Sequence, residues 1–158
     1  MSDGGRKKKG MEAESIIKFR DQVLLELKRA ERYRNFLSML VLNLSEFLSS
    51  AGRRKIKSDK DADEFIKDLL YRLRLVSRET DTISPIDHSR LVMLLPETDK
   101  KGANVASNRI RGQLSDYLSE FLELDYQFDV KVEIASFPDN NRDDVSFKSK
   151  LNSLFGVN

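Results

Sequence analysis

The sequence predicts an α/β domain in which a mixed central β-sheet is flanked by helices. Two short runs, residues 36–44 and 91–95, are almost continuously apolar, as expected of strands buried on both faces. Longer stretches repeat apolar side chains at three- and four-residue spacing, which is typical of amphipathic helices that cover a sheet. The chain has 158 residues and 39% apolar content, enough for the core of one compact domain.

The predicted elements follow one another as helix, strand, helix, hairpin, helix, strand and helix. Acidic residues at 61–64 favour the start of the second helix, because carboxylates complement the positive end of a helix dipole. Residues 129–136 alternate apolar and charged side chains, which predicts a strand with one exposed face. The expected ranges are helix 12–34, strand 36–44, helix 61–76, hairpin strands 82–86 and 90–95, helix 100–123, strand 129–136 and helix 145–155.

Composition excludes several classes of function. The chain has no cysteine and one histidine, His88, so disulfides, thiolate metal sites and a Ser-His-Asp triad are not expected. No apolar run reaches membrane-spanning length and no signal-peptide pattern is present, which favours a soluble cytoplasmic protein. Residues 1–11, with Lys7-Lys8-Lys9, are expected to form a disordered basic tail ahead of a domain over 12–158.

Several segments match, in order and spacing, the motifs of one known family. The quoted segments are the helix running into a strand at 19–40, Arg78-x-x-Asp81 ahead of a turn, the strand Leu-Val-Met-Leu-Leu-Pro-Glu-Thr at 91–98, the helix at 103–111 and the strand Val-Lys-Val-Glu-Ile at 130–134. Over residues 19–138 the chain thereby resembles the GGDEF family, the bacterial diguanylate cyclase domain. The resemblance implies a nucleotidyl cyclase-like fold and a role in signal transduction.

The signature turn departs from the family pattern. The Gly-Gly-Asp/Glu-Glu-Phe turn of the family corresponds here to Asp87, His88, Ser89, Arg90 and Leu91. Side chains replace the glycines that let a nucleotide lie against bare backbone, and the acidic pair is replaced by a hydroxyl and a positive charge. The resemblance therefore implies a degenerate, catalytically inactive domain. A new activity that uses His88 with Asp87 is an alternative for this turn.

The other positions of the family's active site also differ. The metal-binding aspartate corresponds to Asn43 and the aspartate two residues later to Ser45, while Phe47-Leu48 is what remains of a guanine-contacting segment. Asp63 falls where the family has a base-contacting aspartate. Two-metal phosphoryl transfer needs closely placed carboxylates. No catalytic residue, metal site or Mg²⁺ cofactor is therefore expected, and Asn43 and Asp63 also fit ordinary strand-end and helix-start roles.

The family's inhibitory site, in contrast, keeps its residues. Arg78, Asp81 and Arg109 match the RxxD motif and the third arginine that bind cyclic di-GMP in the family. An arginine fork suits guanine O6 and N7 or a phosphate, and an aspartate can accept from the guanine N1–H and N2–H edge. The resemblance implies a cyclic di-GMP receptor that signals to a protein partner, and ligand-driven homodimerisation is a further expectation.

Two alternatives stay open beside the receptor hypothesis. Arg78 and Asp81 could form an ordinary surface ion pair in a pseudoenzyme that binds no nucleotide and serves as a protein interaction module. Its docking surface would then be the first helix, the basic segment 53–60 or the turn tip. Nucleic-acid binding through Lys7-Lys8-Lys9 and residues 53–60 is the less favoured third reading, and no membrane partner is expected.

Overall fold

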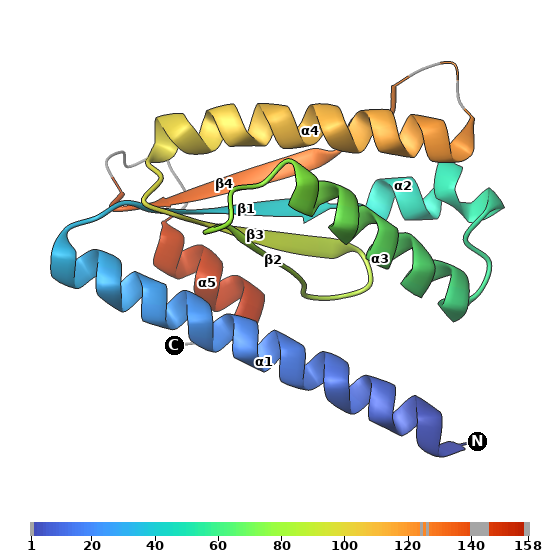
Figure 1. Cartoon of the computed structure of the whole chain (residues 1–158), viewed down its shortest axis with the longest axis horizontal. Coiled ribbons are helices and arrows are strands. Elements are labelled where there is room, and N and C mark those ends of the chain that lie inside the picture. The colour runs from blue at the N-terminus through green and yellow to red at the C-terminus, as the bar shows by residue number, and fades with distance from the viewer. Residues whose placement is uncertain (1, 124, 126, 140–145, 157–158) are drawn as a thin grey trace.

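The computed structural model describes residues 2–123, 125, 127–139 and 146–156, with side chains described from residue 15 onward. A central sheet lies between two layers of helices (Figure 1). The elements are α1 (Ser2–Tyr33), β1 (Leu37–Asn43), α2 (Ser45–Ser49), the 3-10 helix η1 (Ala51–Arg54), α3 (Asp59–Leu75), β2 (Thr82–Pro85), β3 (Arg90–Pro96), α4 (Lys100–Leu122), β4 (Lys131–Phe137) and α5 (Phe147–Phe155). The predicted α/β class, with a central sheet flanked by helices, is confirmed.

The sheet has four strands in the order β2-β3-β1-β4 among the described residues. All three pairings are antiparallel. The sequence predicted a mixed sheet, and this detail of strand direction is wrong. The physical reason is that β1 lies between β3 and β4, two strands joined by α4 that run in the same direction as each other and opposite to β1. The register sets Asn43 of β1 opposite Arg90 of β3 on one side and Lys131 of β4 on the other.

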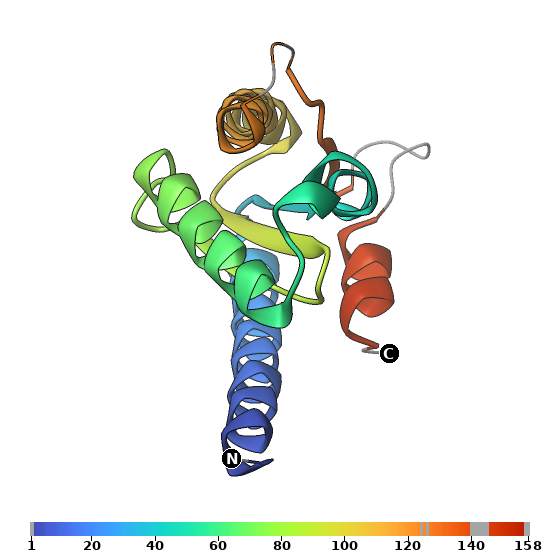
Figure 2. The ribbon, with the colours of Figure 1, turned by 90° about the vertical axis from the view of Figure 1, so that its right-hand side faces the viewer.

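The two central strands are buried on both faces, which confirms the prediction made from their apolar runs. Alternate residues of β1 and β3 point to opposite sides of the sheet, because the side-chain period of a strand is two. On one side Leu40, Leu42 and Met93 pack beneath α3 and α4. On the other side Met39 and Leu94 join α1 and α5. Figure 2 shows the two helical layers on either side of the sheet.

The segment between β1 and α3 is more ordered than the sequence suggested. The predicted basic loop over 53–60 contains the end of η1 and the first residues of α3. The Ser58 hydroxyl accepts a hydrogen bond from the Asp61 amide at 3.1 Å, which caps α3 and moves its start to Asp59, ahead of the expected Asp61. Short helices with few apolar positions carry too weak a periodicity to be recognised from the sequence.

The chain ends differ from the predicted boundaries. The backbone of α1 begins at Ser2, so residues 2–11 continue the helix where a disordered tail was expected. A helix already formed over 12–33 extends at little cost, which explains the difference, and the division of the chain at residue 12 stays a prediction. Most of the expected loop at 138–144 and the start of the last helix at Val145 lie outside the described residues. Within the described part, no helix has the length and apolarity needed to cross a bilayer.

Phe47 of α2 illustrates how the first turn after β1 is held. Its side chain is fully buried, stacks on Phe65 with ring centroids 5.6 Å apart and meets the edge of Phe128 at 5.3 Å. Gly52 lies directly against it, since a Cβ there would come within 2.9 Å of the Phe47 ring. Phe47 is thus part of the core rather than of an open nucleotide site.

Replacing Phe47 with alanine is expected to lower the free energy of unfolding by about 3–5 kcal/mol, because it removes a buried ring and leaves a cavity. Urea unfolding followed by circular dichroism measures this. Tyr71→Ala is the matched control, since Tyr71 is an exposed aromatic on α3. Equal effects of the two substitutions would show that Phe47 is not a core residue.

Candidate functional site

The turn between α3 and β2 is built around Asp81. The α3 helix ends where the Ser77 hydroxyl donates to the Leu73 carbonyl at 2.5 Å. The chain then turns back, with the Asp81 amide donating to the Arg78 carbonyl and the Arg78 amide donating to Asp81 Oδ2, both at 3.0 Å. Arg74 closes the turn from the helix by donating to the Asp81 carbonyl at 3.0 Å. This local network fixes the positions of both Arg78 and Asp81.

The Asp81 carboxylate is buried and paired. Only 1% of the side chain is exposed, and Arg78 Nη2 donates to Oδ1 at 3.0 Å while Nε donates to Oδ2 at 3.4 Å. A buried carboxylate is costly unless it is paired and hydrogen-bonded. The expectation of an exposed surface pair is therefore wrong for Asp81, although the Arg78 side chain is still half exposed at 51%.

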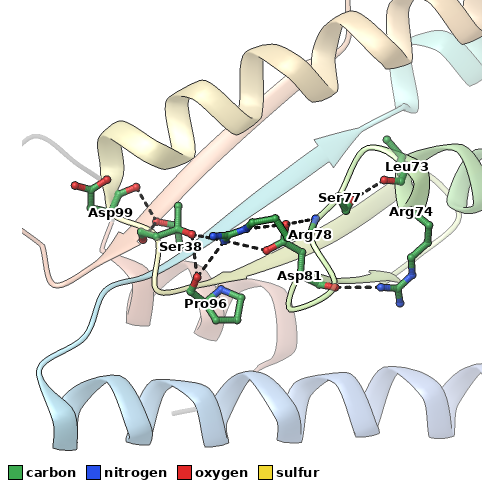
Figure 3. Close-up of polar contacts among 9 residues, drawn as sticks. Ser38, Leu73, Arg74, Ser77, Arg78, Asp81, Pro96 and Asp99 are labelled. Carbon is green, nitrogen blue, oxygen red and sulfur yellow. Dashed lines mark hydrogen bonds and ion pairs between the residues drawn. The ribbon is translucent and has the colours of Figure 1, made fainter.

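Arg78 also ties this turn to the junction between β3 and α4. Its Nη2 donates to the Pro96 carbonyl at 3.1 Å and to Thr98 Oγ1 at 2.6 Å (Figure 3). The buried Ser38 of β1 continues the network, donating to the Thr98 carbonyl at 2.7 Å and lying 2.8 Å from Ser136 Oγ of β4. One guanidinium group thereby joins segments that are distant along the chain.

Above this network lies a pocket of about 380 Å³, called here the Arg78 pocket. It contains all three predicted ligand-binding residues, and Arg109 reaches it from α4. Arg109 is exposed and makes no ion pair or hydrogen bond with another residue that the structure describes. The pocket is lined by Phe36, Arg78, Asp81, Leu95, Glu97, Thr98, Asp99, Gly102, Val105, Ala106 and Arg109.

Asp81 takes a different place in the pocket from the one expected. The sequence suggested that its carboxylate would face a guanine edge, but in the structure both oxygens accept from Arg78. Asp81 therefore orients Arg78, whose Nε and Nη2 are both used by contacts within the fold. The charged side chains of the lining are two arginines and three carboxylates, a formal net charge of −1.

Beyond Arg78, Asp81 and Arg109, no lining residue of the pocket was predicted as a site residue, and Phe36, Glu97 and Val105 are exposed members of that remainder. Phe36 was assigned to a buried strand, yet 45% of it is exposed, and β1 begins one residue later. Glu97 belonged to the strand segment 91–98 quoted for the family resemblance, and it has the left-handed φ of 52°. No signal in the sequence could have placed them together, because they meet only through the folding of β1 beside β3 and α4.

The tip of the hairpin is closed by Asp87. Its Oδ1 accepts from the amides of Ser89 and Arg90 at 2.9 and 2.7 Å, and its Oδ2 accepts from Arg90 Nε at 2.8 Å. Partial burial alone would raise the pKa of the Asp87 carboxyl, but these hydrogen bonds and the Arg90 charge hold it below its ordinary value. The stabilisation is present at neutral pH and is lost as the pH falls through this lowered pKa. His88 and Asp87 are exposed, and Leu91 belongs to the core.

The positions that correspond to the family's metal site carry little negative charge. Asn43 Oδ1 accepts from the Ser45 amide at 2.9 Å and thus supports the turn into α2. Its cross-strand neighbours are the cationic Arg90 and Lys131. Asp63 lies in the first half of α3, half-buried. The described residues contain no group of three or more histidines, aspartates or glutamates able to hold a metal ion.

Comparison with known proteins was made by sequence and by structure. No family model and no curated protein matches the sequence. The fold matches solved structures, among them the active GGEEF domain of a diguanylate cyclase from Vibrio cholerae. That match has a TM-score of 0.60 at 18% identity and covers 74% of this chain and 72% of the other.

Two further structural neighbours were determined as complexes. The GGDEF domain of DgcB from Caulobacter crescentus, solved with c-di-GMP, has a TM-score of 0.59 at 14% identity over 75% of this chain and 67% of its own. Diguanylate cyclase SiaD from Pseudomonas aeruginosa, solved with its activator SiaC, has a TM-score of 0.61 at 12% identity over 87% of this chain and 50% of its own. The chain therefore has the fold of GGDEF diguanylate cyclase domains.

Proposed function

We propose that this chain is a GGDEF-type signalling domain that binds cyclic di-GMP in the Arg78 pocket and does not synthesise it. The observation that carries the proposal is that Arg78 and Arg109, from two separate elements, line one pocket. The neighbour from Caulobacter crescentus, solved with c-di-GMP, supports the same class of ligand. The RxxD resemblance of the sequence points to the same residues.

The chemistry of the pocket suits one end of the dinucleotide. A volume of about 380 Å³ is near the lower limit of small-molecule pockets, roughly 300–1,000 Å³, so one guanine and its neighbouring phosphate would fill it. Arginine offers a planar fork that matches guanine O6 and N7 or two phosphate oxygens. Arg109 supplies such a fork, and Arg78, held in place by Asp81, adds its positive charge and its remaining nitrogen, Nη1.

The proposal that the chain does not synthesise cyclic di-GMP rests on residues at the opposite end of the sheet. Phosphoryl transfer by two metal ions needs carboxylates that hold the metals close together. Asn43, flanked by Arg90 and Lys131, provides an amide between two positive charges. The Asp87 carboxylate is already occupied by the turn that it closes. The positive charges of Arg90 and Lys131 would disfavour a metal ion beside Asn43.

A second candidate function is a protein interaction module without a nucleotide. The neighbour SiaD favours it, because that diguanylate cyclase was solved in complex with a protein, its activator SiaC. In this chain, α1 carries Ile17 and Leu25, each nearly half exposed, on its outer surface. A partner whose capture is unaffected by substitutions at Arg78 and Arg109 would support this function over the first.

Arg109→Ala is expected to weaken binding of cyclic di-GMP about ten- to hundredfold, because a charge-assisted contact is lost. Isothermal titration calorimetry measures the affinity. Arg111→Ala is the matched control: Arg111 lies on the same helix but is paired with Asp129 at 2.8 Å and does not line the pocket. Absence of binding by the folded unsubstituted protein would refute the proposed function.

Asp81→Asn is expected to reduce both stability and affinity. The amide cannot accept from Arg78 with both atoms, and the loss of a charged, largely buried pair should cost about 1–3 kcal/mol of unfolding free energy. Thermal unfolding and calorimetry on the same preparation check the two effects. A variant with unchanged affinity would show that the position of Arg78 does not depend on Asp81.

Incubation of the protein with GTP and Mg²⁺ or Mn²⁺ is expected to yield no cyclic di-GMP by liquid chromatography, because the metal-holding charges are missing. An active GGDEF domain assayed in parallel serves as the control. Product formation that disappears in Asn43→Ala would place an active metal site at the end of β1 and overturn this part of the proposal.

A further inference from the structure

Beyond its arginines, the Arg78 pocket has an aromatic wall. Phe36 is the residue before β1, and its ring is left 45% exposed while Leu37 next to it is buried. Val105 of α4, 62% exposed, contributes a second apolar side chain to the same pocket. An exposed aromatic ring in a pocket that also contains arginines offers a flat surface on which a nucleobase can stack.

Glu97 adds an acceptor to the pocket. It lies between Pro96 and Thr98, and Arg78 donates a hydrogen bond to each of these two neighbours. A non-glycine residue in the left-handed region, here with φ of 52°, persists only where surrounding contacts determine the backbone. Glu97 is exposed, lines the pocket, and its carboxylate makes no hydrogen bond or ion pair with any other described residue.

Guanine is the base whose two edges match this set of groups. It presents O6 and N7 as acceptors on one edge and the N1–H and N2–H groups as donors on another. Arginine is the complement of the first edge and a carboxylate is the complement of the second. Adenine has an acceptor at N1 where guanine has a donor, and a carboxylate facing it would be repelled.

We infer that Glu97 and Phe36 make the Arg78 pocket specific for guanine, which rests on the proposed function. Glu97 accepts from the N1–H and N2–H groups of one guanine, and Phe36 stacks on its face. Glu97 thereby takes the role that the buried Asp81 carboxylate cannot fill. The charged side chains of the lining carry a net charge of −1. A Glu97 carboxylate that did not contact the base would only repel a dianionic ligand, so removing its charge would strengthen binding. The direction in which the affinity changes therefore tests the inference.

The first experiment compares cyclic di-GMP with cyclic di-IMP, whose hypoxanthine base lacks the 2-amino group. The unsubstituted protein should bind cyclic di-GMP about tenfold more tightly, because one charge-assisted hydrogen bond is lost with the amino group. Glu97→Gln should weaken cyclic di-GMP about tenfold and cyclic di-IMP less, because hypoxanthine keeps the N1–H donor but lacks the amino group, and the ratio of the two affinities should fall toward one. Glu79→Gln, the same change at an exposed position outside the pocket, should keep the ratio.

Tighter binding of both ligands by Glu97→Gln would overturn the inference, since that is the result expected of an unpaired negative charge. An unchanged ratio would overturn it as well. If the unsubstituted protein binds neither ligand, the proposed function falls and takes the inference with it. Binding that depends on Arg109 but not on Glu97 would refute the inference alone.

The second experiment tests the stacking surface. Phe36→Ala should weaken cyclic di-GMP about tenfold or more through loss of a base–aromatic contact. Tyr33→Ala, which removes an exposed aromatic ring outside the pocket, should leave the affinity unchanged. Circular dichroism confirms that both variants fold. Equal affinities of the two variants would exclude Phe36 as a stacking residue.

Discussion

The buried carboxylate of Asp81 imposes the main constraint on this end of the molecule. Removing a carboxylate from water is costly unless a cation and hydrogen-bond donors accompany it. Arg78 supplies the cation and side-chain donors, and the same guanidinium group also donates to Pro96 and Thr98 in the β3–α4 junction. The foot of the hairpin, the β3–α4 junction and the floor of the pocket are therefore held by one paired charge.

The two ends of the sheet have opposite electrostatic character. At the end with the hairpin tip, the only carboxylate of the turn is bound to its own backbone and to Arg90, and Asn43 lies between positive residues. At the other end, arginines and an accessible carboxylate surround a cavity. At the tip the Asp87 carboxylate is used by the turn itself, whereas Glu97 and Arg109 of the pocket make no hydrogen bond or ion pair with another described residue.

Much of the fold follows from the spacing of apolar residues along the sequence. The apolar runs of β1 and β3 predict burial on both faces, and the three-to-four spacing predicts α3 and α4, because both reflect the geometry of regular elements. The meeting of Arg78 and Arg109 was predicted through family resemblance. The sequence did not predict the burial of Asp81 or the presence of Phe36 and Glu97 in the pocket. These features depend on tertiary contacts between strands and, for Glu97, on a left-handed backbone conformation. The antiparallel direction of all strand pairs likewise depends on connections whose path the sequence does not reveal.

The Arg78 pocket is made from the start of β1, the α3–β2 turn, the β3–α4 junction and the middle of α4. These segments are brought together only by the completed fold, so an unfolded chain offers a ligand nothing comparable. Any molecule held there binds the native state alone and shifts the folding equilibrium in proportion to the logarithm of its concentration. The amount of intact, protease-resistant domain would then report the level of that molecule even before any partner is engaged.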